Sequence, residues 1–237
     1  MKHRFFVPDI HLDDVTTLTG EELHHAARVV RVREGEEVEL FDGRGAIVTA
    51  RVEALTREKA ILRVVGPVAE TRESPLALHL AMAIINLDKF ELVLQKATEL
   101  GIRSMIPIVS DRVEIRAERY RGKQERWEKI IFEAVKQCGR ARVPLLEEAQ
   151  EFADVIARDG VKFFLDADVE PLAAPERVAE ATLFIGPEGG WSDEELALAR
   201  ANGAIFRRMG PRRLRAETAA IAACTIFAAR YGDILID

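Results

Sequence analysis

Two glycine-containing segments in the last third of the chain most constrain what it can fold into. The first reads Gly-Pro-Glu-Gly-Gly-Trp-Ser from Gly186 to Ser192, and the second begins about twenty residues later and spans Gly210 to Thr218. Each follows a short apolar run, at 182–185 and 204–206, and each precedes a helical pattern. Two strand-to-helix loops of this kind can form the walls of one ligand site.

The first loop carries its own signals of local structure. Ser192 and Glu195 have the spacing of a capping box, which predicts a helix start there. Gly186, Gly189 and Gly190 tolerate positive φ and allow another molecule to approach the backbone, although an ordinary turn remains the alternative for this loop taken alone. Neither loop has the Gly-x-Gly-x-x-Gly or the Gly-Lys-Ser/Thr pattern, which argues against binding through a pyrophosphate.

Strand and helix patterns alternate from residue 76 to the end. Leu76 to Ile85 reads as a buried strand, and the residues after it recur at helical spacing. The last helix, from about Glu217 to Tyr231, is apolar nearly all round, so we expect the core and a second subunit to bury it on more than one side. This alternation predicts a parallel α/β sheet with its ligand site at the carboxyl ends of the strands.

The residues before position 70 follow a different pattern. Segments 37–41, 46–52 and 60–65 alternate apolar and polar residues, as short strands in hairpins do. A polar segment bounded by prolines, 66–75, then reads as a linker. The sequence therefore predicts a compact β domain followed by a larger α/β domain.

Composition is that of a cytoplasmic enzyme of two modest domains. The chain has 237 residues, of which 48% are hydrophobic and 31% charged. It shows no signal peptide and no apolar run of the roughly 20 residues that would span a bilayer. Cys138 and Cys224 lie far apart without metal-ligand spacing, so no metal site is predicted.

The net charge of −6 conceals a local excess of basic residues. Residues 102–143 hold eleven Lys and Arg against six Asp and Glu, and five arginines crowd the second loop between 207 and 215. A basic face on an acidic protein is suited to RNA phosphates. The alternative is a solvated face whose arginines pair with neighbouring glutamates.

Taken together, these motifs resemble one family along nearly the whole chain. The two loops are similar to the paired signature of the 16S ribosomal RNA uridine N3-methyltransferases, the RsmE family of the SPOUT class. Segments 24–31, 40–43, 95–101 and 133–140 also resemble that family's sequence. The chain departs from the family pattern at Cys138, at Ala216 and at Leu87 to Lys89, and only the last departure affects a loop before a helix.

The resemblance implies a fold and an activity that periodicity alone does not predict. It implies a PUA-like, RNA-binding β-barrel over 1–70 and a SPOUT α/β methyltransferase domain over 76–237, with a carboxy-terminal trefoil knot and a homodimer formed through that domain. The implied reaction is transfer of a methyl group from S-adenosylmethionine to N3 of one uridine in the 16S rRNA of the 30S subunit. Neither a metal nor a membrane takes part.

Matching positions supply the candidate binding residues. The cofactor candidates lie in the two loops, and the RNA candidates are arginines. The cofactor set is Ile185, Gly186, Glu188, Gly189, Gly190, Met209, Gly210, Leu214, Arg215, Ala216 and Thr218, and the RNA set is Arg28, Arg31, Arg33, Arg112, Arg116, Arg140 and Arg142.

The catalytic candidates are Glu217, Arg215 and Arg140. All five histidines precede the first helix of the α/β domain, so the base that removes the N3 proton is sought among carboxylates, with Glu217 ahead of Glu188. A helix-capping role is the alternative for Glu217, because an acid stabilises the start of a helix. Arginine can stabilise the negative charge of the uridine, or clamp phosphate, or pair on the surface.

Other interpretations stay open at this point. Trp191 suits either stacking on a base or packing at the helix start. A nonenzymatic RNA-binding protein would explain the basic face but would not need two cofactor-type loops. A SPOUT methyltransferase acting on transfer RNA or on another ribosomal position would share every cofactor argument, and a small-molecule nucleotide enzyme lacks its phosphate motif.

Overall fold

The protein, seen in a computed structural model, is described over residues 3–12, 15–69, 72–115, 117–168, 170 and 173–235. Its segments cluster into two compact units. The first unit consists of residues 1–73 together with 135–143, and the second consists of residues 74–134 together with 144–237. The chain therefore passes between the units after residues 73, 134 and 143, whereas the sequence pattern predicts a single break near residue 70.

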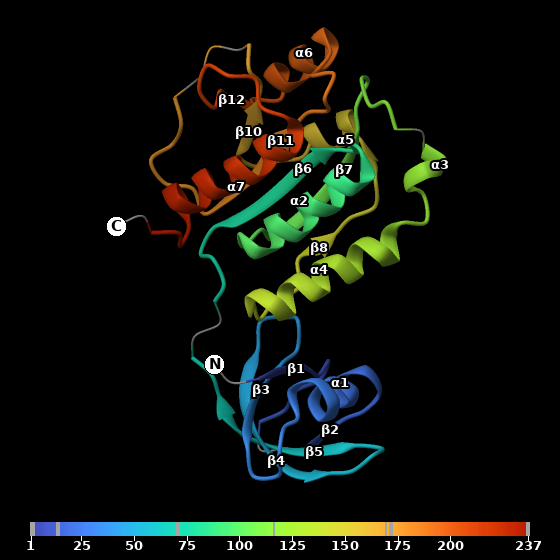
Figure 1. Cartoon of the computed structure of the whole chain (residues 1–237). Coiled ribbons are helices and arrows are strands. Elements are labelled where there is room, and N and C mark those ends of the chain that lie inside the picture. The colour runs from blue at the N-terminus through green and yellow to red at the C-terminus, as the bar shows by residue number, and fades with distance from the viewer. Residues whose placement is uncertain are drawn as a thin grey trace. The chain divides into compact units, whose positions relative to one another are not determined.

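A curved five-stranded sheet forms the first unit (Figure 1), in the order β1-β3-β4-β5-β2. β1 and β3 are parallel, and the other neighbours are antiparallel. Register shifts between β4 and β5 bend the sheet, as bulges do, into a PUA-like half-barrel. The three predicted hairpin strands are confirmed as β3, β4 and β5. The bounds are β1 Arg4–Phe6, β2 Val15–Leu18, β3 Glu37–Phe41, β4 Ile47–Leu55 and β5 Ala60–Pro67.

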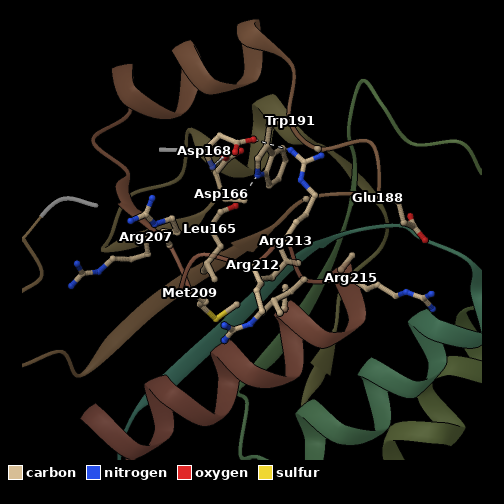
Figure 2. Close-up of a pocket in the computed structure, with 18 of the residues that line it drawn as sticks. Leu165, Asp166, Asp168, Glu188, Trp191, Arg207, Met209, Arg212, Arg213 and Arg215 are labelled. Atoms are coloured by element: carbon tan, nitrogen blue, oxygen red, sulfur yellow. Dashed lines mark hydrogen bonds and ion pairs between the residues drawn. The ribbon is translucent and has the colours of Figure 1, made fainter. Parts of the chain in front are cut away.

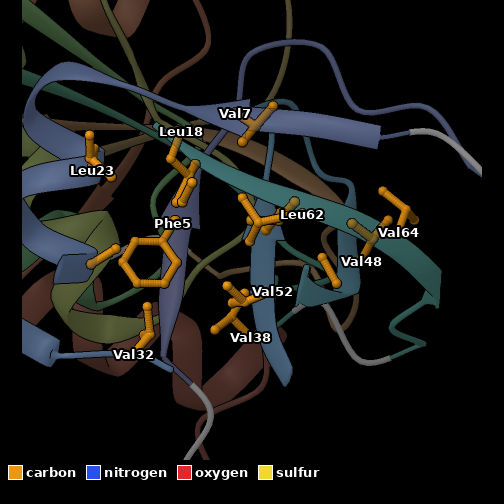
Figure 3. Close-up of a cluster of buried hydrophobic side chains, with 14 residues drawn as sticks. Phe5, Val7, Leu18, Leu23, Val32, Val38, Val48, Val52, Leu62 and Val64 are labelled. Carbon is orange, nitrogen blue, oxygen red and sulfur yellow. The ribbon is translucent and has the colours of Figure 1, made fainter. Parts of the chain in front are cut away.

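The core of the first unit lies on one face of this sheet (Figure 3). Alternate residues of a strand point to the same face, so Val38, Val52 and Leu62 meet there around Phe5. Helix α1 (Gly20–His24) and the π-helix η1 (His25–Val30) follow β2, and Leu23 of α1 joins the cluster. A π-helix is rare and has no simple sequence signature, and the strand pattern does not predict it.

Polar contacts fix the second stretch of the first unit, 135–143, to the rest of that unit. The guanidinium of Arg4 donates hydrogen bonds to the carbonyl oxygens of Gly139 and Arg140. The carboxylate of Glu73 accepts hydrogen bonds of 2.9 Å from the main-chain N–H groups of the two residues after Arg140. The end of a helix that starts in the second unit thus completes the first.

A seven-stranded parallel sheet forms the second unit, in the order β12-β10-β11-β6-β7-β8, with β9 also paired to β7. The predicted strand at 76–85 is confirmed as β6, and the predicted parallel α/β sheet is confirmed with it. The bounds are β6 Ala77–Ala83, β7 Ser104–Val109, β8 Leu145–Leu146, β9 Gln150–Glu151, β10 Lys162–Leu165, β11 Glu180–Ile185 and β12 Ile205–Arg207.

Helices cover both faces of this sheet. α2 and α7 lie side by side on one face (Figure 1), and α5 and α6 contact each other on the opposite face. The trefoil knot implied by the family resemblance stays a prediction. The helix bounds are α2 Leu87–Glu99, α3 Ala117–Tyr120, α4 Gln124–Cys138, α5 Phe152–Ile156, α6 Asp193–Ala201 and α7 Ala216–Tyr231.

Two successive phenylalanines of β10 show how the sheet is buried from both sides. The ring of Phe163 lies 4.5 Å from that of Phe227 in α7, measured between centroids. The ring of Phe164 points the other way and lies 4.5 Å from the indole of Trp191. A strand buried on both faces needs an unbroken apolar run, and β10 has one in residues 163–165.

Helix α7 packs one face against the core formed by the described residues. Its small residues Ala220, Ala223 and Ala228 are buried together with Phe227, whereas Ile226 on the outer face is 51% exposed. The prediction that this helix is buried by the core is therefore confirmed. Its burial by a second subunit stays a prediction.

Candidate functional site

Three loops of the second unit enclose a pocket of about 410 Å³ (Figure 2). They follow β10, β11 and β12, which are neighbours in the sheet, so their carboxyl ends meet at one edge. The lining also includes the first turn of α7. The lining residues are Leu165, Asp166, Ala167, Asp168, Ile185, Gly186, Pro187, Glu188, Gly190, Trp191, Arg207, Arg208, Met209, Gly210, Arg212, Arg213, Leu214, Arg215, Ala216 and Ala219.

The loop after β11 is shaped by a turn and a helix cap. The N–H of Gly190 donates to the carbonyl of Pro187 at 3.0 Å, and Gly190 has a φ of 71°, which glycine adopts without strain. The hydroxyl of Ser192 accepts from the N–H of Glu195 at 3.1 Å, and the Glu195 carboxylate accepts from the N–H of Ser192 at 2.8 Å. The predicted capping box is confirmed, and it fixes where the loop ends.

The segment after β7 is tied to the same loop. The Ser192 hydroxyl donates to the carboxylate of Asp111 at 2.5 Å, and the N–H of Asp111 donates to Glu195 at 3.1 Å. The guanidinium of Arg112 donates to the carbonyl of Gly189 at 3.1 Å. A Cβ on Gly189 would lie 3.1 Å from the Cβ of Arg112, so glycine lets the two segments approach closely.

Trp191 forms the floor of the pocket. Its side chain is buried, and its Nε1 donates to the carbonyl of Leu165 at 3.0 Å. A Cβ on Gly186 would lie 2.9 Å from the indole, so only glycine allows the strand end to rest on this ring. Of the two roles considered for Trp191, packing at the helix start agrees with this burial, and stacking on a base does not.

The end of β12 and the loop after it bring five arginines to the pocket, at 207, 208, 212, 213 and 215. Figure 2 shows Arg213 reaching across to Asp168 on the loop after β10, where the two side chains form an ion pair of 2.8 Å. Both partners are more than three-quarters exposed, so the pair contributes little to stability. The cluster makes this side of the pocket basic.

Most of the predicted cofactor residues line the pocket. Two do not. Gly189 packs against Arg112 through the contact described above, and Thr218 is exposed in the first turn of α7. The residues that do line it are Ile185, Gly186, Glu188, Gly190, Met209, Gly210, Leu214, Arg215 and Ala216.

Two of the three catalytic candidates lie together at the start of α7. Arg215 is the exposed N-cap residue, and Glu217 sits in the first turn, where the helix dipole favours a negative charge. One carboxylate oxygen of Glu217, Oε1, lies 3.7 Å from Nζ of Lys89. The other, Oε2, is buried and has no hydrogen-bond partner among the described residues.

The third candidate, Arg140, belongs to the first unit. It is 3% exposed, and its guanidinium forms an ion pair of 2.8 Å with Glu73. Its side chain contacts Glu73 and its carbonyl accepts a hydrogen bond from Arg4, and both of these contacts lie within the first unit. A catalytic role for Arg140 stays a prediction.

The arginines predicted to bind RNA have different surroundings. Arg28, Arg31 and Arg33 are exposed in the first unit, and Arg31 ends η1 with a φ of 61°. Arg112 is exposed and supports the Gly189 loop, whereas Arg142 is half-buried. The remaining two are Arg140, described above, and Arg116, which lies outside the described residues.

Sequence reasoning missed the loop after β10. Asp166 and Asp168 line the pocket, and the N–H of Asp168 donates to the Asp166 carboxylate at 2.7 Å. The signal that points to them is modest: two aspartates directly after a buried strand. The same reasoning also missed Lys89, whose ammonium group lies beside both Glu188 and Glu217.

The described residues form neither a metal centre nor a membrane-spanning helix. No group of three or more His, Cys, Asp and Glu side chains there is arranged to hold a metal ion. No described helix combines the length and apolar character needed to cross a membrane.

Known protein families match both units of the chain. An RNA methyltransferase domain family matches residues 72–228, and an RNA methyltransferase PUA domain family matches residues 18–65. Ribosomal RNA small subunit methyltransferase E of Synechocystis sp. is 31% identical, over 92% of this chain and 75% of that protein. The protein of the same name from Bacillus subtilis is 29% identical, over 86% of this chain and 85% of that one.

Solved structures agree with these matches. A Legionella pneumophila protein in complex with the bound cofactor SAM superimposes with a TM-score of 0.87 at 32% identity, covering 99% of this chain and 100% of that one. Ribosomal RNA small subunit methyltransferase E from Neisseria gonorrhoeae, bound to S-adenosyl methionine, gives a TM-score of 0.86 at 28% identity, with the same coverage. The similarity thus extends over the full length of the chain.

Proposed function

This chain belongs to the ribosomal RNA small subunit methyltransferase E family, and we propose that it transfers a methyl group from S-adenosylmethionine to N3 of one uridine in the 16S rRNA of the 30S subunit. The observation that carries this proposal is the pocket formed by three loops at the carboxyl edge of the parallel sheet. Ligands of open α/β sheets bind at such an edge.

The pocket's lining suits S-adenosylmethionine. Its volume of about 410 Å³ falls within the roughly 300–1,000 Å³ that is usual for small-molecule sites. Leu165, Ile185 and Leu214 offer apolar walls for the adenine, and the glycine loops offer main-chain groups. The carboxylates of Asp166 and Asp168 suit hydroxyl groups and a positive amino group. When bound, this cofactor supplies an electrophilic methyl carbon on a positively charged sulfur.

Side chains at the start of α7 would act on the uridine that accepts the methyl group. Uridine N3 becomes a nucleophile only when its proton leaves, so the site needs an acceptor for that proton. We assign this role to Glu217, with Glu188 as the other candidate carboxylate. Arg215, exposed at the pocket, would stabilise the negative charge shared by N3 and O4. Arg140 is the remaining candidate for charge stabilisation or phosphate binding.

We propose that residues 1–70 form the RNA-binding domain and residues 76–237 the methyltransferase domain. In the first of these, Arg28, Arg31 and Arg33 are exposed on one short stretch of chain, which suits contacts to phosphates. In the second, the arginine-rich loop after β12 gives the pocket itself a basic side.

We also propose that the protein is a cytoplasmic homodimer formed through the second unit. Two large apolar side chains are exposed on the adjacent helices α2 and α7, Leu92 at 42% and Ile226 at 51%. We expect these two side chains to lie within a larger apolar contact with a second copy, because extended apolar surface marks protein–protein interfaces. Light scattering during size exclusion should give twice the chain mass for the native protein and a single chain mass for Ile226→Glu.

The test of the proposed activity is methyl transfer from labelled S-adenosylmethionine to 30S subunits isolated from a strain that lacks this protein, with the modified nucleoside identified by mass spectrometry. We expect 3-methyluridine in the 16S rRNA. Donor binding without 3-methyluridine would keep the cofactor site and overturn the substrate, in favour of transfer RNA or another ribosomal position. No donor binding would favour a nonenzymatic RNA-binding protein.

A further inference from the structure

A lysine outside the pocket lining connects two of the pocket's walls. The ammonium Nζ of Lys89 lies 3.6 Å from Oε1 of Glu188 and 3.7 Å from Oε1 of Glu217. Glu188 belongs to the loop after β11, and Glu217 to the first turn of α7, directly after the loop that follows β12. Lys89 itself belongs to α2. One cation from a third element therefore bridges the loop after β11 and the start of α7.

The backbone of Lys89 is well anchored, so its side chain is held close to these carboxylates. Asn86 caps α2 by accepting a hydrogen bond of 3.1 Å from the N–H of Asp88. The next residue after Lys89, Phe90, is fully buried, and its ring lies 4.8 Å from that of Trp127. The start of α2 is thus fixed on both sides of Lys89.

Only one of the two carboxylate oxygens of Glu217 has a polar partner among the described residues. Its side chain is 13% exposed, compared with 42% for Glu188 and 35% for Lys89. Lys89 is beside Oε1, while Oε2 is buried without a hydrogen-bond partner among the described residues. A buried acceptor without a partner is rare in folded proteins and marks a carboxylate whose surroundings are not those of an ordinary surface acid.

Without Lys89, the two carboxylates would face the same small region with no cation between them. Like charges repel, so the two side chains would then turn away from each other. We therefore expect Lys89 to set the distance between the two carboxylates.

We propose that Lys89 is a positioning residue for methyl transfer: it holds the carboxylates of Glu188 and Glu217, so that Glu217 stays in place at the start of α7 to accept the N3 proton of the target uridine. This inference rests on the proposed function. The N3 proton moves to the Glu217 carboxylate, which becomes a neutral acid, and the electron pair stays on N3 to form the bond to the methyl carbon as the donor's carbon–sulfur bond breaks. Lys89 touches neither reactant in this step.

The test compares substitutions of two lysines on the same helix. Lys96 forms a pair of 2.9 Å with Glu99 and is not part of the pocket, so Lys96→Met is the matched control. We expect Lys89→Met to lower kcat by about 10- to 100-fold, the range that misplacement of a reacting group produces. The KM for S-adenosylmethionine and the melting temperature should stay close to those of the wild type. Lys89→Arg should restore much of the activity, and Lys96→Met should retain it.

A double variant separates positioning from a merely structural effect. If Lys89 acts through Glu217, then Lys89→Met should lower kcat little further in a Glu217→Gln background. Independent, multiplicative losses, or a Lys89→Met enzyme as active as the wild type, would overturn the inference and leave the proposed function standing. A wild-type protein that transfers no methyl group to 30S subunits would overturn both.

Discussion

The indole Nε1 of Trp191 donates a hydrogen bond of 3.0 Å to the main-chain carbonyl of Leu165, and this bond joins two of the loops that enclose the pocket. Leu165 is the last residue of β10, whereas Trp191 ends the loop after β11. The same ring lies against Gly186 and forms the bottom of the pocket, so its position determines how deep the pocket is.

Replacement of Trp191 by Phe should weaken both folding and donor binding. The buried carbonyl of Leu165 would lose its partner, which costs about 1–3 kcal/mol in the free energy of unfolding. Urea unfolding and calorimetric titration with S-adenosylmethionine would measure the two effects. Trp127 is the matched control, because its buried Nε1 has no hydrogen-bond partner among the described residues. Trp127→Phe should therefore lower the free energy of unfolding less and leave the affinity for S-adenosylmethionine unchanged. Equal losses of stability and affinity in the two variants would contradict this account.

Replacement of Ser192 by Ala should remove one of the three polar contacts that hold the segment after β7 against the loop after β11 and the start of α6. The helix cap contributes about 1 kcal/mol, and Asp111 would lose the hydroxyl that donates to it. We expect lower stability in urea and weaker donor binding, whereas Ser192→Thr, which keeps a hydroxyl, should behave nearly as the wild type. Unchanged binding in Ser192→Ala would show that the pocket does not depend on this link.

Replacement of Arg140 by Met distinguishes a structural from a catalytic role. Removing one partner of a buried ion pair typically costs about 3–5 kcal/mol, because the other charge is left uncompensated. The contact with Glu73 predicts this loss of stability, with methyl transfer per folded molecule close to that of the wild type at low temperature. A variant that unfolds like the wild type but transfers no methyl group would instead support catalysis by Arg140.

The two cysteines should differ sharply in reactivity. Burial raises the pKa of the Cys224 thiol from 9.0 to about 12, whereas Cys138 is only partly buried. A thiol-specific reagent at about pH 8 should label Cys138 first and Cys224 only after denaturation, as judged by mass spectrometry. Above pH 9 the unfolded thiol loses its proton while the native one keeps it, so this group lowers stability as pH rises from 9 towards 12. Equal labelling of both thiols in the native protein would contradict their observed burial.

Local signals predicted the regular elements well. Strand β3 alternates apolar and polar residues, and helix α7 is a long alanine-rich apolar run, and the observed bounds of both lie within one residue of the predicted ones. The inclusion of residues 135–143 in the first unit was not predictable in this way. It depends on contacts such as that of Glu73 with the N–H of Arg142, which join residues 69 positions apart.

The site was predictable only where its loops carry glycine. The segments around Gly186 and Gly210 signal a close approach of backbone and ligand, and both line the pocket. Asp166 has no such signal, because its place depends on β10 lying between β11 and β12, and sheet order is a long-range property. Lys89 was missed for the same reason: its carboxylate partners come from two distant loops.

The first unit is built from two separate stretches of the chain, and this affects how the protein folds during synthesis. A nascent chain leaves the ribosome from its amino terminus, and a domain completes its folding only when all its parts have emerged. Because residues 135–143 belong to the first unit, that unit stays incomplete until well over half of the 237 residues have been translated. By then strands β6 and β7 of the second unit are also outside. The first unit therefore completes its folding only after part of the second has emerged, and the second, which needs β10 to α7, completes its folding last.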